Sequence, residues 1–184
     1  EGATIISGQN STEVKASWPN AGTGHLTLVV VNNNTQCISR KTVAITVNAV
    51  PVPAISANDE VCQNSTDFPT AITLTASPND LSSYAWAYDG GTATAGAGDY
   101  QKNVSWTTVG NHTVSVKVTD DKNCSARTTH TVMVNALPIL SVSTTSVQCN
   151  GGNDGTITAT ATNGAEPYSY TLDGNTSSTT GEFT

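Results

Sequence analysis

The segment His112-Thr113-Val114-Ser115-Val116-Lys117-Val118-Thr119 decides the fold class of this chain. Its apolar residues alternate with polar ones, which places the three valines on one face of a β-strand. The polar stretch Asp120-Asp121-Lys122-Asn123 follows, and Thr128 to Val134 then alternates in the same way. Two alternating runs joined by a short polar turn predict a β-hairpin with one buried face.

The same alternation recurs outward from this hairpin, in Ala71-Ile72-Thr73-Leu74-Thr75 and in Gly155-Thr156-Ile157-Thr158-Ala159-Thr160. Turn residues interrupt the chain about every 8–12 residues, and no longer stretch has a helical period. The sequence therefore predicts an all-β protein built from tandem immunoglobulin-like antiparallel β-sandwich modules.

The composition fits many short strands and excludes two classes of protein. Of 184 residues, 14 are acidic and 7 are basic, giving a net charge of −7 and a pI of about 4.6, while Thr and Ser together number 49. Phosphate contacts require basic residues, so nucleic acid is not an expected partner. No apolar run approaches the ~20 residues of a spanning helix, so no membrane span is expected in this segment.

An internal repeat gives the domain organisation. Asn48-Ala49-Val50-Pro51 matches Asn135-Ala136-Leu137-Pro138 at an offset of 87 residues, and Trp18 meets Trp106 after a one-residue slip. A fixed period of this length indicates tandem sandwich domains. At the same offset, without a gap, further pairs coincide: His25 with His112, Val29 with Val116, Val31 with Val118, Cys37 with Cys124, Arg40 with Arg127, Val47 with Val134, and Cys62 with Cys149.

Prolines mark the module boundaries, because Pro51, Pro53 and Pro138 each follow a predicted strand and cannot donate to a β-ladder. We expect residues 1–50 to be the C-terminal part of one module, residues 51–137 a complete module, and residues 138–184 the N-terminal part of another. Proline connectors of this kind keep the links between modules short and stiff.

The four cysteines have no metal-site spacing, which favours disulfides in an oxidising compartment. Four cysteines allow three pairings, and the repeat selects among them because only the middle module contains two. We expect a Cys62–Cys124 disulfide that ties the first strand to the turn of the C-terminal hairpin. Cys37 and Cys149 are expected to pair with cysteines outside this segment.

The middle module resembles the PKD-like domains of large secreted proteins of Bacteroidota. The resemblance rests on six short stretches taken in order: Val61-Cys62-Gln63-Asn64-Ser65, Tyr84-Ala85-Trp86, Asp89-Gly90-Gly91, Val104-Ser105-Trp106, Gly110-Asn111-His112-Thr113-Val114 and Asn123-Cys124. Residues 1–50 are similar to the second half of the same family.

The last part resembles a different family, the SprB-type repeats of gliding-motility adhesins. It carries Cys149-Asn150-Gly151-Gly152-Asn153-Asp154-Gly155, followed by Pro167-Tyr168-Ser169-Tyr170. By resemblance, such arrays form the extended stalks of cell-surface adhesins that are exported through the type IX secretion system. The resemblance implies an extracellular location.

The candidate chemical groups favour structural interpretations. No nucleophile or metal-hydrolase motif occurs, so we expect no catalytic and no metal-binding residues. His25 and His112 share a repeat position in phase with core valines and are expected to be structural. Gly90 to Gly98 is expected to be a surface loop, since no helix follows that could bind phosphate. Asp120-Asp121 and Asn153-Asp154 could supply oxygens to calcium, but neither forms an EF-hand loop, and solvated turns are expected.

The function expected from these features is a non-enzymatic structural stalk or filament segment of a long cell-surface adhesin. Its partners would be neighbouring modules of the same chain or filament, with a surface polysaccharide as a further partner class. The alternative is a spacer or carbohydrate-binding module of a secreted polysaccharide-degrading enzyme, which an exposed row of Trp18, Trp86 and Trp106 would favour. A third hypothesis is a polymer whose modules are completed by strands from a neighbouring chain.

Overall fold

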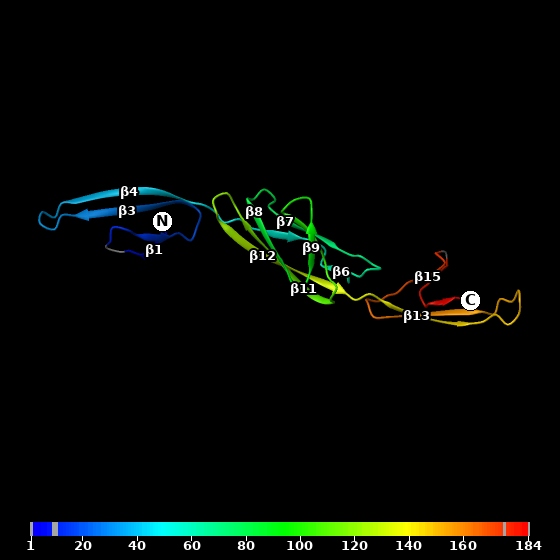
Figure 1. The fold of residues 1–184 in the computed structure, drawn as a ribbon. Coiled ribbons are helices and arrows are strands. Elements are labelled where there is room, and N and C mark those ends of the chain that lie inside the picture. The colour runs from blue at the N-terminus through cyan, green and yellow to red at the C-terminus, as the bar shows by residue number, and fades with distance from the viewer. Residues whose placement is uncertain (1, 9–10, 175, 184) are drawn as a thin grey trace. The chain divides into compact units, whose positions relative to one another are not determined.

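The computed structural model describes residues 2–8, 11–174 and 176–183, and these residues form strands, turns and loops without any helix (Figure 1). The prediction of an all-β fold is confirmed. The strands are β1 (Thr4–Ser7), β2 (Lys15–Ser17), β3 (Gly22–Val31), β4 (Ile38–Val47), β5 (Ala54–Ser56), β6 (Glu60–Cys62), β7 (Ile72–Ser77), β8 (Ser83–Tyr88), β9 (Thr92–Ala95), β10 (Gln101–Ser105), β11 (Gly110–Thr119), β12 (Ser125–Asn135), β13 (Ile139–Thr145), β14 (Thr156–Thr162), β15 (Tyr170–Leu172), β16 (Thr176–Ser178) and β17 (Glu182–Phe183).

Strands β5 to β12 form a sandwich of two four-stranded sheets, with strand orders β5-β7-β10-β9 and β6-β12-β11-β8. The predicted hairpin from His112 to Val134 corresponds to β11 and β12, and the run around Ile72 corresponds to β7. One pairing differs from the predicted antiparallel arrangement, because β6 and β12 run parallel. The predicted loop from Gly90 to Gly98 is only partly a loop, since β9 lies within it and pairs with β10.

The core of the sandwich lies between its two sheets, as alternation predicts. Val114, Val116 and Val118 of β11 have no exposed surface, and Trp106 is 1% exposed. The core cluster comprises Ile72, Leu74, Val104, Trp106, Val114, Val132 and Val134, and five half-buried residues pack against it: Ile55, Ala57, Val61, Trp86 and Tyr88. Burial of this apolar surface is the main stabilising contribution to the module.

Strands β1 to β4 repeat β9 to β12, with a one-residue difference inside the hairpin turn. The bounds of β1 and β3 become those of β9 and β11 when 88 is added, whereas β4 begins 87 residues before β12. Glycines agree with the offset of 88: Gly2 and Gly90, and Gly22 and Gly110, all have positive φ. The extra residue therefore lies in the six-residue turn 32–37, which is matched by the five-residue turn 120–124.

This register corrects the gapless alignment of the sequence. At an offset of 88, Trp18 matches Trp106 directly, and Gly24, not His25, takes the position of His112. His25 is exposed, whereas His112 is only 8% exposed. A side chain at Gly24 would collide with the indole of Trp18, with its Cβ 2.3 Å from Nε1, so a glycine fits beside that ring. On β3, the face equivalent to the core face of β11 carries Leu26, Leu28 and Val30, which correspond to Val114, Val116 and Val118.

Residues 139–183 contain the sheet β13-β14-β17 and the hairpin β15-β16. The predicted strand around Ile157 is confirmed as β14. The register pairs Leu140 with Ala161 and Val142 with Ala159, so these apolar residues share one face. The opposite face carries mainly Ser and Thr, including a hydrogen bond between the Thr145 and Thr156 hydroxyls at 2.8 Å.

Candidate functional site

Within residues 2–8, 11–174 and 176–183, no group of three or more His, Cys, Asp or Glu side chains is arranged to hold a metal ion. The carboxylates considered for calcium are engaged in turns. The Asp120 Oδ1 accepts hydrogen bonds from the backbone N–H groups of Lys122 and Cys124, at 2.9 and 2.8 Å. The Asp154 Oδ1 accepts one from the Gln148 N–H at 3.2 Å. Asp120 closes its turn in the manner of an Asx motif, whereas Asp154 bonds back to a residue that precedes it.

His112 is held inside the sandwich by backbone groups. Its Nδ1 lies 2.8 Å from the Asp89 carbonyl oxygen, and its Nε2 lies 3.0 Å from the Thr108 carbonyl oxygen. The ring packs against Trp106 with centroids 5.7 Å apart. The Thr108 hydroxyl also lies 3.3 Å from Nε2, and no serine or cysteine side chain of the described residues contacts either ring nitrogen. These contacts tie the ring to Asp89 and Thr108, which is the arrangement of a structural histidine.

The predicted Cys62–Cys124 disulfide does not fit the sandwich. Cys62 ends β6 and is paired with Asn135, the last residue of β12, whereas Cys124 directly precedes Ser125, the first residue of β12. The 11 residues of β12 separate the two positions by about 35 Å at the rise of an extended strand. A disulfide requires Cα atoms within about 7 Å. No disulfide joins any two of the four cysteines in the structure, and three of them, Cys37, Cys62 and Cys149, are exposed. The pairing of Cys37 and Cys149 with cysteines outside this segment stays a prediction.

The three tryptophans do not present an exposed aromatic row. Trp106 is buried, and its Nε1 donates a hydrogen bond to the Asp89 carbonyl oxygen at 3.0 Å. Trp18 is half-buried, and its Nε1 is buried without a hydrogen-bond partner among the described residues. Trp86 packs against the core cluster. Sugar-stacking platforms need exposed ring faces, so the tryptophans give no support to a carbohydrate site.

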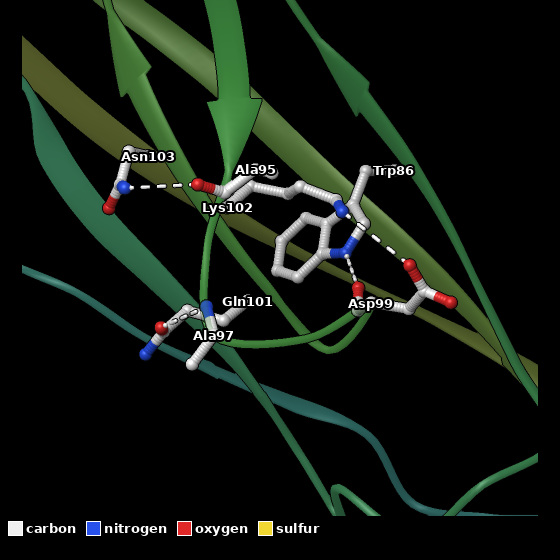
Figure 2. Close-up of polar contacts among 7 residues, drawn as sticks. All are labelled: Trp86, Ala95, Ala97, Asp99, Gln101, Lys102 and Asn103. Atoms are coloured by element: carbon white, nitrogen blue, oxygen red, sulfur yellow. Dashed lines mark hydrogen bonds and ion pairs between the residues drawn. The ribbon is translucent and has the colours of Figure 1, made fainter.

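Trp86 packs beside the loop that joins β9 to β10, in a site formed with Asp99 and Lys102 that we call the Trp86 seat (Figure 2). Figure 2 shows its indole N–H directed at the carbonyl oxygen of Asp99, at 2.9 Å, with the Lys102 side chain alongside. The Lys102 ammonium lies 3.8 Å from the Asp99 carboxylate. Tyr88, two residues along β8, is stacked on Trp86 with ring centroids 6.3 Å apart. This aromatic strand covers one side of the core.

The equivalent seat in residues 1–50 is an open apolar groove of about 650 Å³. Its lining includes Ile5, Ser11, Thr12, Val14, Leu26 and Leu28. Leu28 is 66% exposed, and Val30 and Val43 on the same sheet face are 57% and 52% exposed. The sequence indicates this apolar face, since Leu26, Leu28 and Val30 stand at every second position of the strand. The gapless alignment instead places Val29 and Val31 at the core positions.

No helix in the described part of the chain is long and apolar enough to cross a membrane. No curated protein matches this chain. Residues 141–177 match the SprB repeat family model. The match supports the resemblance seen around Cys149, and it relates this part of the chain to cell-surface adhesins of the gliding-motility type.

Proposed function

We propose that this chain is a load-bearing stalk segment of a long extracellular adhesin, exported by the type IX secretion system. The SprB match over residues 141–177 supports the adhesin assignment. Its module division is the one expected from sequence: the C-terminal part of a PKD-like module in residues 1–50, a complete PKD-like module in 51–137, and the start of a SprB-type module from 138. A stalk carries tension along the chain, so the decisive question is how the complete module resists it.

The parallel pair β6–β12 is the observation that carries the mechanical role. Glu60, Val61 and Cys62 are in register with Met133, Val134 and Asn135. Tension from the N-terminal side passes through β5 and then reaches the N-terminal end of β6, while tension from the other side enters β12 at its C-terminal end. β6 and β12 are therefore pulled in opposite directions along their axes. All hydrogen bonds between them are then loaded together and are not broken one at a time.

Contacts around this pair reinforce it. The Gln63 N–H donates to the Asn135 carbonyl oxygen at 2.8 Å, and the Met133 N–H donates to the Asp59 carbonyl oxygen at 2.7 Å. The Asn135 Nδ2 donates to the Glu60 carboxylate at 3.1 Å. Val61 packs on the core cluster beside Val134, which is 1% exposed. Because no disulfide spans the module, these hydrogen bonds and this packing would bear the load.

Force spectroscopy on the whole chain between two handles tests this function. We expect one dominant unfolding event, releasing on the order of 250–300 Å of chain for residues 54–135. Gln63→Pro removes the N–H that bonds Asn135, and it should lower the unfolding force clearly. Thr94→Pro in the exposed edge strand β9 is the matched control and should leave the force unchanged. Equal forces in the original chain and Gln63→Pro would contradict the load-bearing role.

The surface location has its own test. An antibody raised against residues 51–137 should label intact cells of the source organism. An in-frame deletion of residues 1–184 from the whole protein should reduce attachment or surface movement without reducing export of the remainder. Labelling only after cell lysis would contradict the adhesin assignment.

A further inference from the structure

The groove in residues 1–50 is lined by residues at positions equivalent to those around Trp86, and no side chain of the described residues takes the place of the indole. At the offset of 88, Ser11 corresponds to Asp99, whose carbonyl oxygen accepts the Trp86 N–H, and Val14 corresponds to Lys102, which lies alongside the indole (Figure 2). Leu26 and Leu28 correspond to Val114 and Val116, the core residues of the central sandwich. All four residues line the groove.

Part of the backbone around the groove is equivalent as well as the side chains. A Cβ added at Gly8 would meet the Glu13 carbonyl oxygen, and one added at Gly96 would meet the Gln101 carbonyl oxygen. The second pair lies 88 residues after the first. The cross-strand partners Ile5 and Ala16 likewise correspond to Ala93 and Val104. The strand pairing beside the groove is therefore repeated as far as Ile5. Beyond it the register shifts by one residue, since Ser7 pairs with Lys15 whereas Ala95 pairs with Lys102.

The neighbouring strand edges are unpaired in the same places. In the central sandwich, β11 lies between β12 and β8, and β10 lies between β9 and β7. In the described part of residues 1–50, β3 pairs only with β4 and β2 pairs only with β1. An apolar face next to free strand edges accepts added strands, because the backbone bonds supply affinity and the pockets supply specificity.

We propose that this groove is the seat of a tryptophan-bearing β-strand of this protein's own repeat. The strand has the pattern of Ser83–Tyr88, adds to the free edge of β3, and directs its indole N–H at the Ser11 carbonyl oxygen. The proposal rests on the module division proposed above and names the occupant of its incomplete module.

The position of this strand in the polypeptide follows from the repeat. Only residues 89–91 separate β8 from β9, so the strand belongs to the same polypeptide and reaches β1 through an equally short turn. A second copy of this chain is a poor donor. Its Trp86 is already packed on its own core and bonded to Asp99, and removing it would expose the residues around Leu74 and Val114.

An extended chain tests the proposal directly. Residues 51–88 are duplicated and fused ahead of Glu1, so that the added Tyr88 is followed by Glu1 and Gly2 in place of Asp89 and Gly90. We expect amide hydrogen exchange of residues 24–30 to slow by at least about tenfold relative to the original chain, since one such factor corresponds to about 1.4 kcal/mol of local opening free energy. Trp86→Ala in the added copy alone should abolish most of this protection.

A second measurement applies if the extension itself fails to fold. A peptide of residues 82–90 is titrated onto the unmodified 184-residue chain and followed by methyl NMR signals of Ile5, Leu26 and Leu28. We expect saturable shifts confined to these residues, and no shifts with the Leu28→Glu variant or with a Trp86→Ala peptide. Unchanged exchange in the extended chain together with no peptide binding overturns the proposal.

Self-association is the competing outcome. A concentration-dependent dimer of the unmodified chain that Leu28→Glu dissolves would assign the face to a second copy and overturn the proposed occupant. None of these results depends on β6–β12 or on surface labelling of cells. Failure of the groove proposal is therefore distinguishable from failure of the stalk function.

Discussion

Trp106 and His112 share one acceptor, the carbonyl oxygen of Asp89, which lies 3.0 Å from the indole Nε1 and 2.8 Å from the imidazole Nδ1. Both rings are buried, so this single backbone oxygen satisfies two polar groups that would otherwise be left without partners in the core. The shared oxygen also fixes the turn between β8 and β9 to the core of the sandwich.

Replacing His112 by Phe should destabilise the central sandwich by roughly 1–2 kcal/mol, because the hydrogen bonds with the Asp89 carbonyl oxygen and the Thr108 hydroxyl are lost while the ring volume is kept. Denaturant unfolding followed by tryptophan fluorescence measures the change. His25→Phe is the matched control: His25 is exposed, and its replacement should change stability by less than about 0.5 kcal/mol. Equal effects at the two positions would contradict the corrected register.

Val116 and Leu28 occupy equivalent positions with opposite environments, since Val116 has no exposed surface and Leu28 is 66% exposed. Val116→Ala should cost about 2 kcal/mol, because the deletion leaves a cavity in a packed core. Leu28→Ala should leave the unfolding free energy of the 184-residue chain within about 0.5 kcal/mol of the original. A loss of 2 kcal/mol at Leu28 would show that its face is already covered.

High pH should weaken the sandwich partly through Tyr88. Burial raises the pKa of the Tyr88 hydroxyl above its ordinary value. The folded state therefore holds this proton more tightly than the unfolded chain does. The contribution to stability is complete below the unfolded pKa of about 10 and is lost as pH rises through the folded pKa.

The Tyr88 effect is measured as a difference between two proteins. Unfolding free energies of the original chain and Tyr88→Phe should run parallel up to about pH 9.5. Above that pH the original chain should fall more steeply. Parallel curves up to pH 11.5 would show that the folded environment of Tyr88 has no effect on its ionisation.

The cysteine geometry predicts that the purified chain contains no intramolecular disulfide between Cys62 and Cys124. Peptide mapping under non-reducing conditions after alkylation of free thiols should recover both as alkylated cysteines. The thiols of Cys37, Cys62 and Cys149 should react fastest, because they are exposed. Recovery of a Cys62–Cys124 linked peptide would mean that the pairing of β6 with the end of β12 is wrong.

Local patterns in the sequence predicted the strands that bury one face. The alternation around Val114 and Val132 is enough to place β11, β12 and their inner residues, because a strand exposes alternate side chains to one environment. The alternation of apolar and polar residues does not identify β9, because Thr92-Ala93-Thr94-Ala95 lies among glycines and has no large apolar residue. That strand forms because β10 offers it an edge, and such pairing is invisible in a single segment.

The wrong predictions share one physical origin, the long-range pairing of strands. The repeat gives the correct period, but an alignment that ignores one inserted residue in the turn exchanges the two faces of the preceding strand, and so gives His25 the role that Gly24 holds. Likewise, the repeat placed two cysteines in one module without showing where they lie. Only the parallel register of β6 on β12 shows that they lie at opposite ends of one strand.

The one-residue difference between the turns 32–37 and 120–124 has a consequence for how such arrays diversify. Each turn is closed by the side chain of its first residue. The Asn32 side chain accepts hydrogen bonds from the backbone N–H groups two and three residues further on, and the Asp120 side chain accepts them from those two and four residues further on. Insertions at this tip leave the register of β4 and β12 untouched. Copies of the module can thus acquire hairpin tips of different length and sequence while every inner side chain keeps its neighbours.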